Sequence, residues 1–276
     1  MTTLSIDWKA LTFQCAHEKD TWPKVAGEPD AEVWFQRGSG LHRAGTAKDD
    51  EALLKEAFAL TKRAAEHGHV LAMNNLVVMY LDGDGVKPSD ANAVEWAEKL
   101  IAMNIGMGYY HMGTFLQQGI GVTEDRKAAL SYFRRAADLG NAQGQLSAGE
   151  TIRKAVAQLG PDEKERGFAV ARAMFQCALD QGLGEAGYAL ARQYVGYESK
   201  PKEALMAYQA AAKLGHVQSL FDLWVLFRDG EYGFEKDVIR SGCYERLWRE
   251  REDDRTKKFP DIDRICPLPP KRMPRN

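Results

Sequence analysis

The stretch GYYHMGTFLQQGIGVTEDRKAALSYFRRAADLGN, from Gly108 to Asn141, contains the pattern that decides the fold. Apolar and small residues recur at helical spacing on both sides of the joint GIGV, which indicates two helices that fold back on each other. In the second helix, Asp125 suits the N-terminal cap, and Gly140 suits the left-handed position that ends a helix. The stretch therefore predicts one helix-turn-helix unit.

The unit recurs along the chain. A small residue lies four places after each junction between consecutive helix-turn-helix units, at Ala72, Gly108, Gly144, Ala186 and Ser219. These residues are 36, 36, 42 and 33 positions apart. A bulky residue follows eight places later each time, at Tyr80, Leu116, Ile152, Tyr194 and Phe227. A degenerate unit precedes them, with AEVWFQRGSGLHRAG and DDEALLKEAFALTKRAAEHG as its helices. Because one helix pair cannot bury its apolar face alone, the pairs predict an all-α, right-handed α-solenoid of about five or six pairs.

The joint first appears as LDGDGV at residues 81–86, where two carboxylates next to glycines suggest a calcium loop. The calcium pattern D-x-[DN]-x-[DN]-G-x5-E fails here because Val86 and Lys87 occupy its fifth and sixth positions. We therefore interpret the glycines as turn residues. Gly83 and Gly119 are expected to take positive φ and to end the first helix of their units.

These residues resemble the Sel1-like repeat, a relative of the tetratricopeptide repeat with the pattern A-x-x-x-L-G-x-x-Y-x-x-G-x-G-V and a second helix ending in A-A-x-x-G-[HN]. The chain ends, LTFQCAHEKD (11–20) and FPDIDRICPLPP (259–270), are similar to a bacterial group of Sel1-repeat proteins found beside type VI secretion lipase effectors of the phospholipase D type. Some members of that group are immunity proteins. The resemblance implies a periplasmic protein whose export signal has been removed, whereas the start MTTLSIDWKA, taken literally, implies a cytoplasmic one.

The sequence suggests three parts: an N-terminal segment (1–30), the repeats (31–235) and a C-terminal capping helix with a Pro-rich tail (236–276). In the capping helix, YERLWREREDDR places opposite charges four residues apart, which suits a solvated helix face: Glu245 with Arg249, and Arg246 with Glu250. The tail CPLPPKRMPRN is expected to be extended and either to lie across the solenoid or to reach a partner.

Composition excludes some classes of function. With 37 basic and 39 acidic residues the net charge is −2, so electrostatics do not favour nucleic acid as a partner. No apolar run approaches the ~18 residues of a membrane helix. The four widely spaced cysteines, Cys15, Cys177, Cys243 and Cys266, form no zinc motif and allow three disulfide pairings; we interpret them as buried or free thiols.

Reactive side chains are scattered, and no phosphate-binding, nucleophile or zinc-protease motif is present. HEKD (17–20) is interpreted as a solvated loop. In HGH, His67 and His69 have the spacing of a metal pair, but the repeat places His or Asn at this junction, which favours a capping role. His111, beside two tyrosines, is interpreted as a packed histidine. The sequence thus predicts no enzyme, no metal site and no cofactor, and a hydrolase is the weakest alternative.

The predicted function is protein binding through the concave face of the solenoid, built from first-helix residues that packing does not use. Superposing the repeats on the tetratricopeptide pattern nominates Asn74, Tyr110, Glu150, Arg153, Tyr188, Arg192 and Arg228. The leading hypothesis is an immunity protein that neutralises a secreted phospholipase effector, and the alternative is a scaffold in signalling or envelope assembly. The sequence does not predict the oligomeric state.

Overall fold

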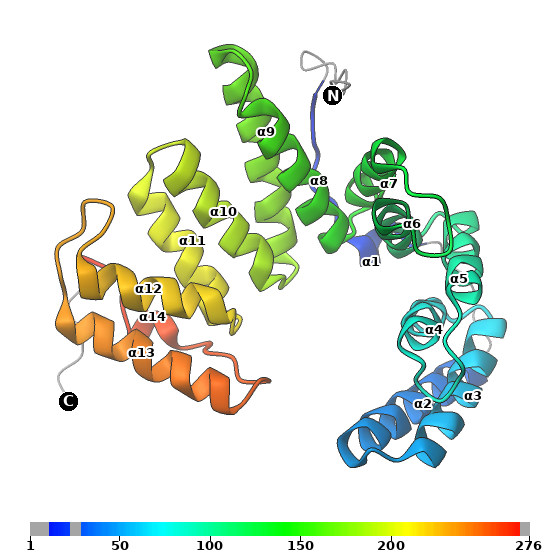
Figure 1. Ribbon diagram of the computed structural model, residues 1–276. Helices are drawn as coiled ribbons and strands as arrows, with labels where there is room; N and C mark the ends of the chain where they lie inside the picture. Colours follow the sequence, from blue (N-terminus) through cyan, green and yellow to red (C-terminus); the bar gives the residue numbers. More distant parts are fainter. Residues whose placement is uncertain (1–10, 23–28, 271–276) are drawn as a thin grey trace. The chain divides into compact units, whose positions relative to one another are not determined.

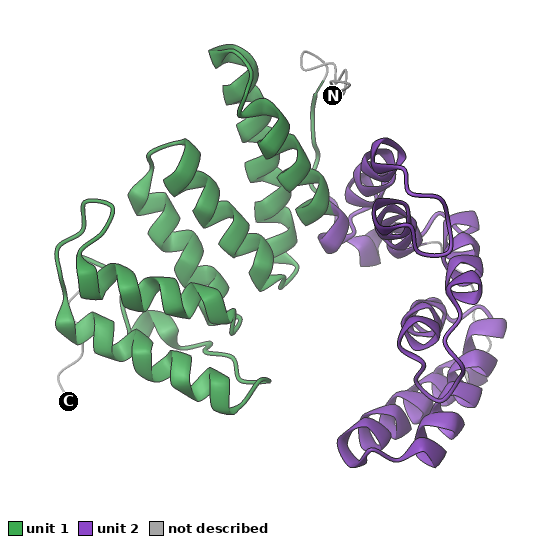
Figure 2. Cartoon of the chain, viewed as in Figure 1, with its two compact units in different colours: residues 1–15, 145–276 green, residues 16–144 purple. Residues whose placement is uncertain are grey.

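The computed structural model describes residues 11–22 and 29–270 (Figure 1). Every regular element in those residues is an α-helix, which confirms the all-α prediction. None of the helices in these ranges has both the length and the apolarity needed to cross a membrane. The chain divides into two compact units, residues 16–144 and residues 1–15 with 145–276 (Figure 2). The three-part division suggested by the sequence stays a prediction.

In the unit of residues 16–144, a short helix precedes three helix pairs. From α2 to α7 each helix packs against the next one along the chain, so neighbouring pairs share a core, as a solenoid requires. The helices are α1 (Glu18–Thr21), α2 (Pro29–Lys48), α3 (Glu51–Glu66), α4 (Val70–Asp82), α5 (Asp90–Ala102), α6 (Gly106–Gln118) and α7 (Arg126–Asp138).

The unit of residues 1–15 and 145–276 is built in the same way. From α9 to α13 each helix packs against the next, and α14 lies against α11. Gly149 of α8 faces Phe175 of α9, since a Cβ at Gly149 would lie 2.7 Å from the ring. The helices are α8 (Ala142–Val156, whose first three residues belong to the other unit), α9 (Pro161–Asp180), α10 (Gly184–Tyr197), α11 (Pro201–Lys213), α12 (Val217–Asp229), α13 (Val238–Asp253) and α14 (Ile262–Ile265).

The glycine joints lie between the paired helices, as predicted. Gly83 ends α4 with φ +83° and Gly119 ends α6 with φ +73°, which confirms their left-handed conformation. Gly85 has φ +69° and a second constraint, because a Cβ there would lie 2.1 Å from the carbonyl oxygen of Leu54. The joint thus combines a chain reversal with close contact to α3 of the preceding pair.

Side chains at the junctions between consecutive helix pairs cap helices. His69 Nδ1 accepts a hydrogen bond of 3.1 Å from the Ala72 N–H at the start of α4. Asn141 and His216 accept corresponding bonds at the starts of α8 and α12. The predicted capping role is therefore confirmed, and each side chain caps the N-terminus of the helix that follows it.

The HEKD segment is not a solvated loop, so that interpretation is wrong: its last three residues open helix α1. The Glu18 carboxylate accepts bonds from the Met107 N–H (2.6 Å) and from Asn141 Nδ2 (2.7 Å). Ile105, the N-cap residue of α6, offers no side-chain acceptor, so Glu18 supplies one from a distant part of the chain. The positive end of the α6 dipole favours this anion, although burial raises the pKa of Glu18.

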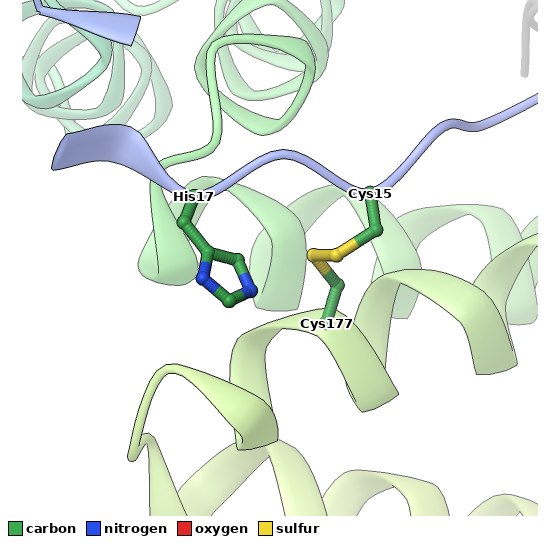
Figure 3. Close-up of side chains that lie close together, drawn as sticks. All are labelled: Cys15, His17 and Cys177. Atoms are coloured by element: carbon green, nitrogen blue, oxygen red, sulfur yellow. A yellow bond between two sulfur atoms is a disulfide. The ribbon is translucent and has the colours of Figure 1, made fainter. Parts of the chain in front are cut away.

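All four cysteines are paired, so the expectation of free thiols is wrong. Cys15 bonds to Cys177 and thereby ties the segment before α1 to α9 (Figure 3). Cys243 bonds to Cys266 and ties α13 to the chain that follows α14. Both bonds cross-link residues of the same compact unit.

The C-terminal cap has the predicted charged face on α13. Further contacts hold the following segment against this helix: Arg240 Nε donates to the Pro267 carbonyl (2.7 Å), and the Tyr244 hydroxyl donates to the Cys266 carbonyl (2.9 Å). The predicted ion pairs are confirmed, Glu245 with Arg249 at 2.7 Å and Arg246 with Glu250 at 3.8 Å. The part of the predicted tail from 271 to 276 lies outside the described residues.

Candidate protein-binding surface

In the unit of residues 16–144, the nominated positions are partly occupied by packing. A hydrogen bond of 2.8 Å joins Asn74 Oδ1 on α4 to His111 Nε2 on α6. Burial lowers the pKa of His111 to about 4, so the ring is neutral at pH 7, which agrees with its interpretation as a packed histidine. Tyr110 is half-buried, with its ring 6.0 Å from that of Phe133. These side chains join neighbouring helices and leave limited area for a partner.

On α8 the two nominated residues differ in exposure. Arg153 is buried, with 9% of its surface exposed, and its Nη1 donates to the Ala189 carbonyl at 2.9 Å. Its guanidinium also lies 5.5 Å from the ring centroid of Phe175. Glu150 pairs with Arg153 (3.6 Å) and lies 3.9 Å from Lys154 at the helix surface. Arg153 therefore joins α8 to α10 and α9, a role that the repeat pattern did not predict.

On α10 the structure brings two nominated residues together with residues of the next helices. Tyr208 is among the groups that raise the pKa of Arg192, and Asp222 is among those that raise the pKa of Tyr188, after the larger effect of burial on each group. The ring centroids of Tyr188 and Tyr208 are 5.8 Å apart. Beside them lies a pocket of about 170 Å³, lined by Arg192, Tyr208, Phe221, Asp222, Val225, Leu226, Glu231 and Tyr232.

An aromatic cluster continues from this pocket onto α12 and α13. Trp224 stacks on Trp248, with ring centroids 5.3 Å apart, and Phe221 meets both rings edge-on. The guanidinium of Arg228 lies 5.4 Å from the Trp224 ring centroid and pairs with Asp229 at 2.7 Å. Phe221 and Trp224 are half-buried, and Arg228 is exposed.

We define the α10–α12 surface as Tyr188, Arg192, Phe221, Trp224, Arg228 and Tyr232. Sequence reasoning nominated three of these residues and missed the other three. The aromatic-rich run SLFDLWVLFRDGEYGF, from Ser219 to Phe234, is the sequence signal that could have identified them. Tyrosine, tryptophan and arginine are the residues that most often carry the binding energy of protein interfaces.

The tyrosine hydroxyls at this surface are protonated. Burial raises the pKa of both Tyr188 and Tyr208, so their hydroxyls stay protonated at pH 7 and serve as hydrogen-bond donors and acceptors. A tyrosine with a raised pKa is a poor nucleophile. The α10–α12 surface therefore presents guanidinium groups, hydroxyls and aromatic rings.

Comparison with known proteins identifies the repeats. A sequence model of the Sel1 repeat matches residues 34–69, 70–104 and 106–141, which confirms the predicted repeat type there. The immunity protein Pa5087 of Pseudomonas aeruginosa is 26% identical, with 94% of this chain and 95% of that chain covered and a TM-score of 0.66. The immunity protein PA5088 of the same organism has a similar fold, with 24% identity, 94% of each chain covered and a TM-score of 0.71. A Sel1 repeat protein from Oxalobacter formigenes is 25% identical, with 81% of this chain and 90% of that chain covered and a TM-score of 0.60.

Proposed function

We propose that this chain, a protein of Sel1 repeats, is an immunity protein that binds a toxic secreted phospholipase of the phospholipase D type and neutralises it without chemical reaction. The observation that carries the proposal is the end-to-end likeness to the immunity protein Pa5087, which extends beyond the three matched repeats to 94% of this chain. The α10–α12 surface supports it, because its composition is that of an interface centre.

The cysteines support a proposal about the compartment. Disulfide bonds form and persist in oxidising compartments such as the bacterial periplasm and are rare in the cytosol. This chain has two of them, at Cys15–Cys177 and Cys243–Cys266, and the second holds the C-terminal cap in place. We therefore propose that the protein works in the periplasm, where a type VI lipase effector would meet its lipid substrate.

The mode of action is occlusion by a preformed surface. The proposed surface lies on packed helices, and an interface that is already ordered loses little conformational entropy on binding. Protection against a toxin requires tight association, in the nanomolar range or better, which corresponds to about −12 kcal/mol. The other nominated residues, Asn74, Tyr110 and Glu150, stay candidates for contact with a partner, whereas Arg153 is buried and donates to the Ala189 carbonyl.

Co-expression tests this function. A secreted effector of the phospholipase D type is exported to the periplasm of a host bacterium, with and without the chain exported alongside it. We expect the host to survive only with the chain, and a chain directed to the cytoplasm is the matched control, which should not protect. Equal killing in all cases would overturn the immunity role, and the scaffold alternative would replace it.

A further inference from the structure

The two disulfide bonds differ in how accessible they are to molecules in solution. Cys15 is exposed and lies in residues 11–17, which form no helix or strand. Its partner Cys177, in the last turn of α9, is only 2% exposed. Figure 3 shows their two sulfurs between this segment and the helix. One cysteine of this bond can therefore be reached from solution, and the other is shielded.

The bond between Cys243 and Cys266 is buried. Cys243 is 9% exposed, and Cys266 is 0% exposed. Hydrogen bonds also fix the backbone of Cys266, because its N–H donates to the Ile262 carbonyl (2.8 Å) and its carbonyl accepts from the Tyr244 hydroxyl (2.9 Å). A thiol in solution cannot approach this bond unless the C-terminal cap opens first. The two bonds thus share the same chemistry and differ in access.

Access decides which disulfide reacts with an external thiol, and at which sulfur. A thiolate attacks one sulfur of a disulfide and expels the other one as a thiolate. Among the disulfides of proteins, the exposed ones are the labile ones. Because Cys177 is buried and Cys15 is exposed, an external thiolate can contact the sulfur of Cys15 and is kept from that of Cys177.

We propose that Cys15 is a thiol-modification site. An external thiolate attacks the Cys15 sulfur and forms a mixed disulfide there, and Cys177 leaves as a thiolate that takes up a proton from water. The reagent is either a low-molecular-weight thiol such as glutathione or the dithiol of an oxidoreductase. With a dithiol, its second thiolate attacks the mixed disulfide and expels Cys15. The reagent is then oxidised to a disulfide, and Cys15 and Cys177 together gain two electrons and two protons.

The modification removes one covalent tie and leaves the neighbouring helix in place. The disulfide ties Cys15 to α9. The residues that follow Cys15 have separate anchors inside the unit of residues 16–144: the Glu18 carboxylate caps α6, and the Thr21 hydroxyl donates to the Leu139 carbonyl at 2.8 Å. Opening the bond therefore frees Cys15 from α9, whereas α1 stays where these hydrogen bonds hold it. The helical fold should persist in the modified protein.

The test treats the folded, purified chain with reduced glutathione in one arm and with a reduced dithiol protein of the thioredoxin type in the other. Both reactions are stopped with N-ethylmaleimide at increasing times, and peptide mapping by mass spectrometry locates every adduct. With glutathione we expect the first product to carry glutathione on Cys15 and maleimide on Cys177, while Cys243–Cys266 opens at least ~10-fold more slowly. The dithiol protein should leave maleimide on both Cys15 and Cys177. Circular dichroism should show unchanged helix content in both arms.

The matched control is the double variant Cys15→Ser, Cys177→Ser, which should acquire no glutathione while its remaining disulfide stays closed. Equal rates of opening for the two bonds of the wild-type chain, or glutathione attached first to Cys177, would overturn the inference. So would a Cys15–Cys177 bond that stays closed in both arms for as long as the protein is folded. The wild-type peptide map decides these outcomes even if the double variant does not fold. Because the chain is tested alone, failure here leaves the proposed function untouched.

Discussion

Replacing Gly85 by alanine should destabilise the unit of residues 16–144 more than replacing Gly119, a glycine of the next joint, by alanine. Gly85 has φ +69°, and a Cβ there would lie 2.1 Å from the Leu54 carbonyl oxygen and 2.3 Å from its carbon. These are backbone atoms of α3, so relief requires a shift of that helix and cannot come from rotation of a side chain. The substitution therefore tests whether the joint packs on the preceding helix pair as the structure shows.

The magnitude has two parts. A left-handed φ costs alanine about 1 kcal/mol relative to glycine. Overpacking against a fixed neighbour typically adds about 1–3 kcal/mol. We therefore expect Gly85→Ala to lower the free energy of unfolding by about 2–4 kcal/mol. Gly119→Ala is the matched control, because its φ is +73° but its Cβ would meet nothing closer than 3.7 Å, so it should cost only about 1 kcal/mol.

Urea unfolding followed by circular dichroism at 222 nm measures both values. Gly40→Ala provides a third arm, because a Cβ at this position in α2 would meet nothing within 4 Å, and it should be neutral or stabilise by up to about 1 kcal/mol. Both joint glycines and Gly40 lie in the same unit, so the three variants report on the same folded body. Equal losses for Gly85→Ala and Gly119→Ala would refute the close contact with Leu54.

Three further predictions concern cross-links, protonation and capping. Protein that is unfolded without reduction should show no thiol that reacts with a disulfide reagent, and a reactive thiol would contradict the pairing. Cys243→Ser should lower the free energy of unfolding by about 2–4 kcal/mol. The folded pKa of His111, about 4, lies below its unfolded value, so the contribution of the neutral ring to the free energy of unfolding should be fully present above pH 6.5. The free energy of unfolding should then fall by up to roughly 3 kcal/mol as the pH drops from 6.5 towards 4. Unfolding at pH 4.5 and 7.5 should show a smaller acid loss for His111→Gln. Glu18→Ala should cost about 1–2 kcal/mol by thermal unfolding, and Glu18→Gln less, because its amide oxygen keeps one acceptor for α6.

The repeated part of the fold was predictable because each rule behind it is local. Small residues recur where helices approach closely: a Cβ at Gly108 would lie 2.6 Å from that of Leu100, and one at Gly144 would lie 2.5 Å from that of Ala136. In the helix pairs that have the G-x-G-V joint, a glycine ends the first helix, as its freedom at positive φ predicts. The regular spacing of small residues and the glycines at helix ends together therefore predicted the helix pairs.

Contacts between residues distant in sequence were not predictable. Glu18 caps a helix that begins 88 residues later, and Cys15 bonds to a cysteine 162 residues away, although nothing local to either residue marks its partner. The short span of α1 carries no periodicity that distinguishes it from a loop.

The candidate site was predictable only in part. The repeat pattern identified helix faces and so found Tyr188 and Arg192, but it assumed that every residue at such a position is exposed. Arg153 is buried because the aromatic rings of Phe175 and Tyr197 lie near its guanidinium. The positive φ of Tyr232 depends on a loop conformation that no propensity of tyrosine predicts.

Stoichiometric binding is the proposed way in which this chain inhibits a phospholipase. The most direct measurement titrates the purified chain into a fixed concentration of a phospholipase D-type effector, far above the expected Kd, and follows release of the phospholipid headgroup. We predict a linear fall in activity that reaches zero at one chain per effector and recovers when the chain is denatured and removed. Loss of activity at far below equimolar chain would show that the chain modifies the effector as an enzyme, and undiminished hydrolysis at excess chain would refute inhibition by binding.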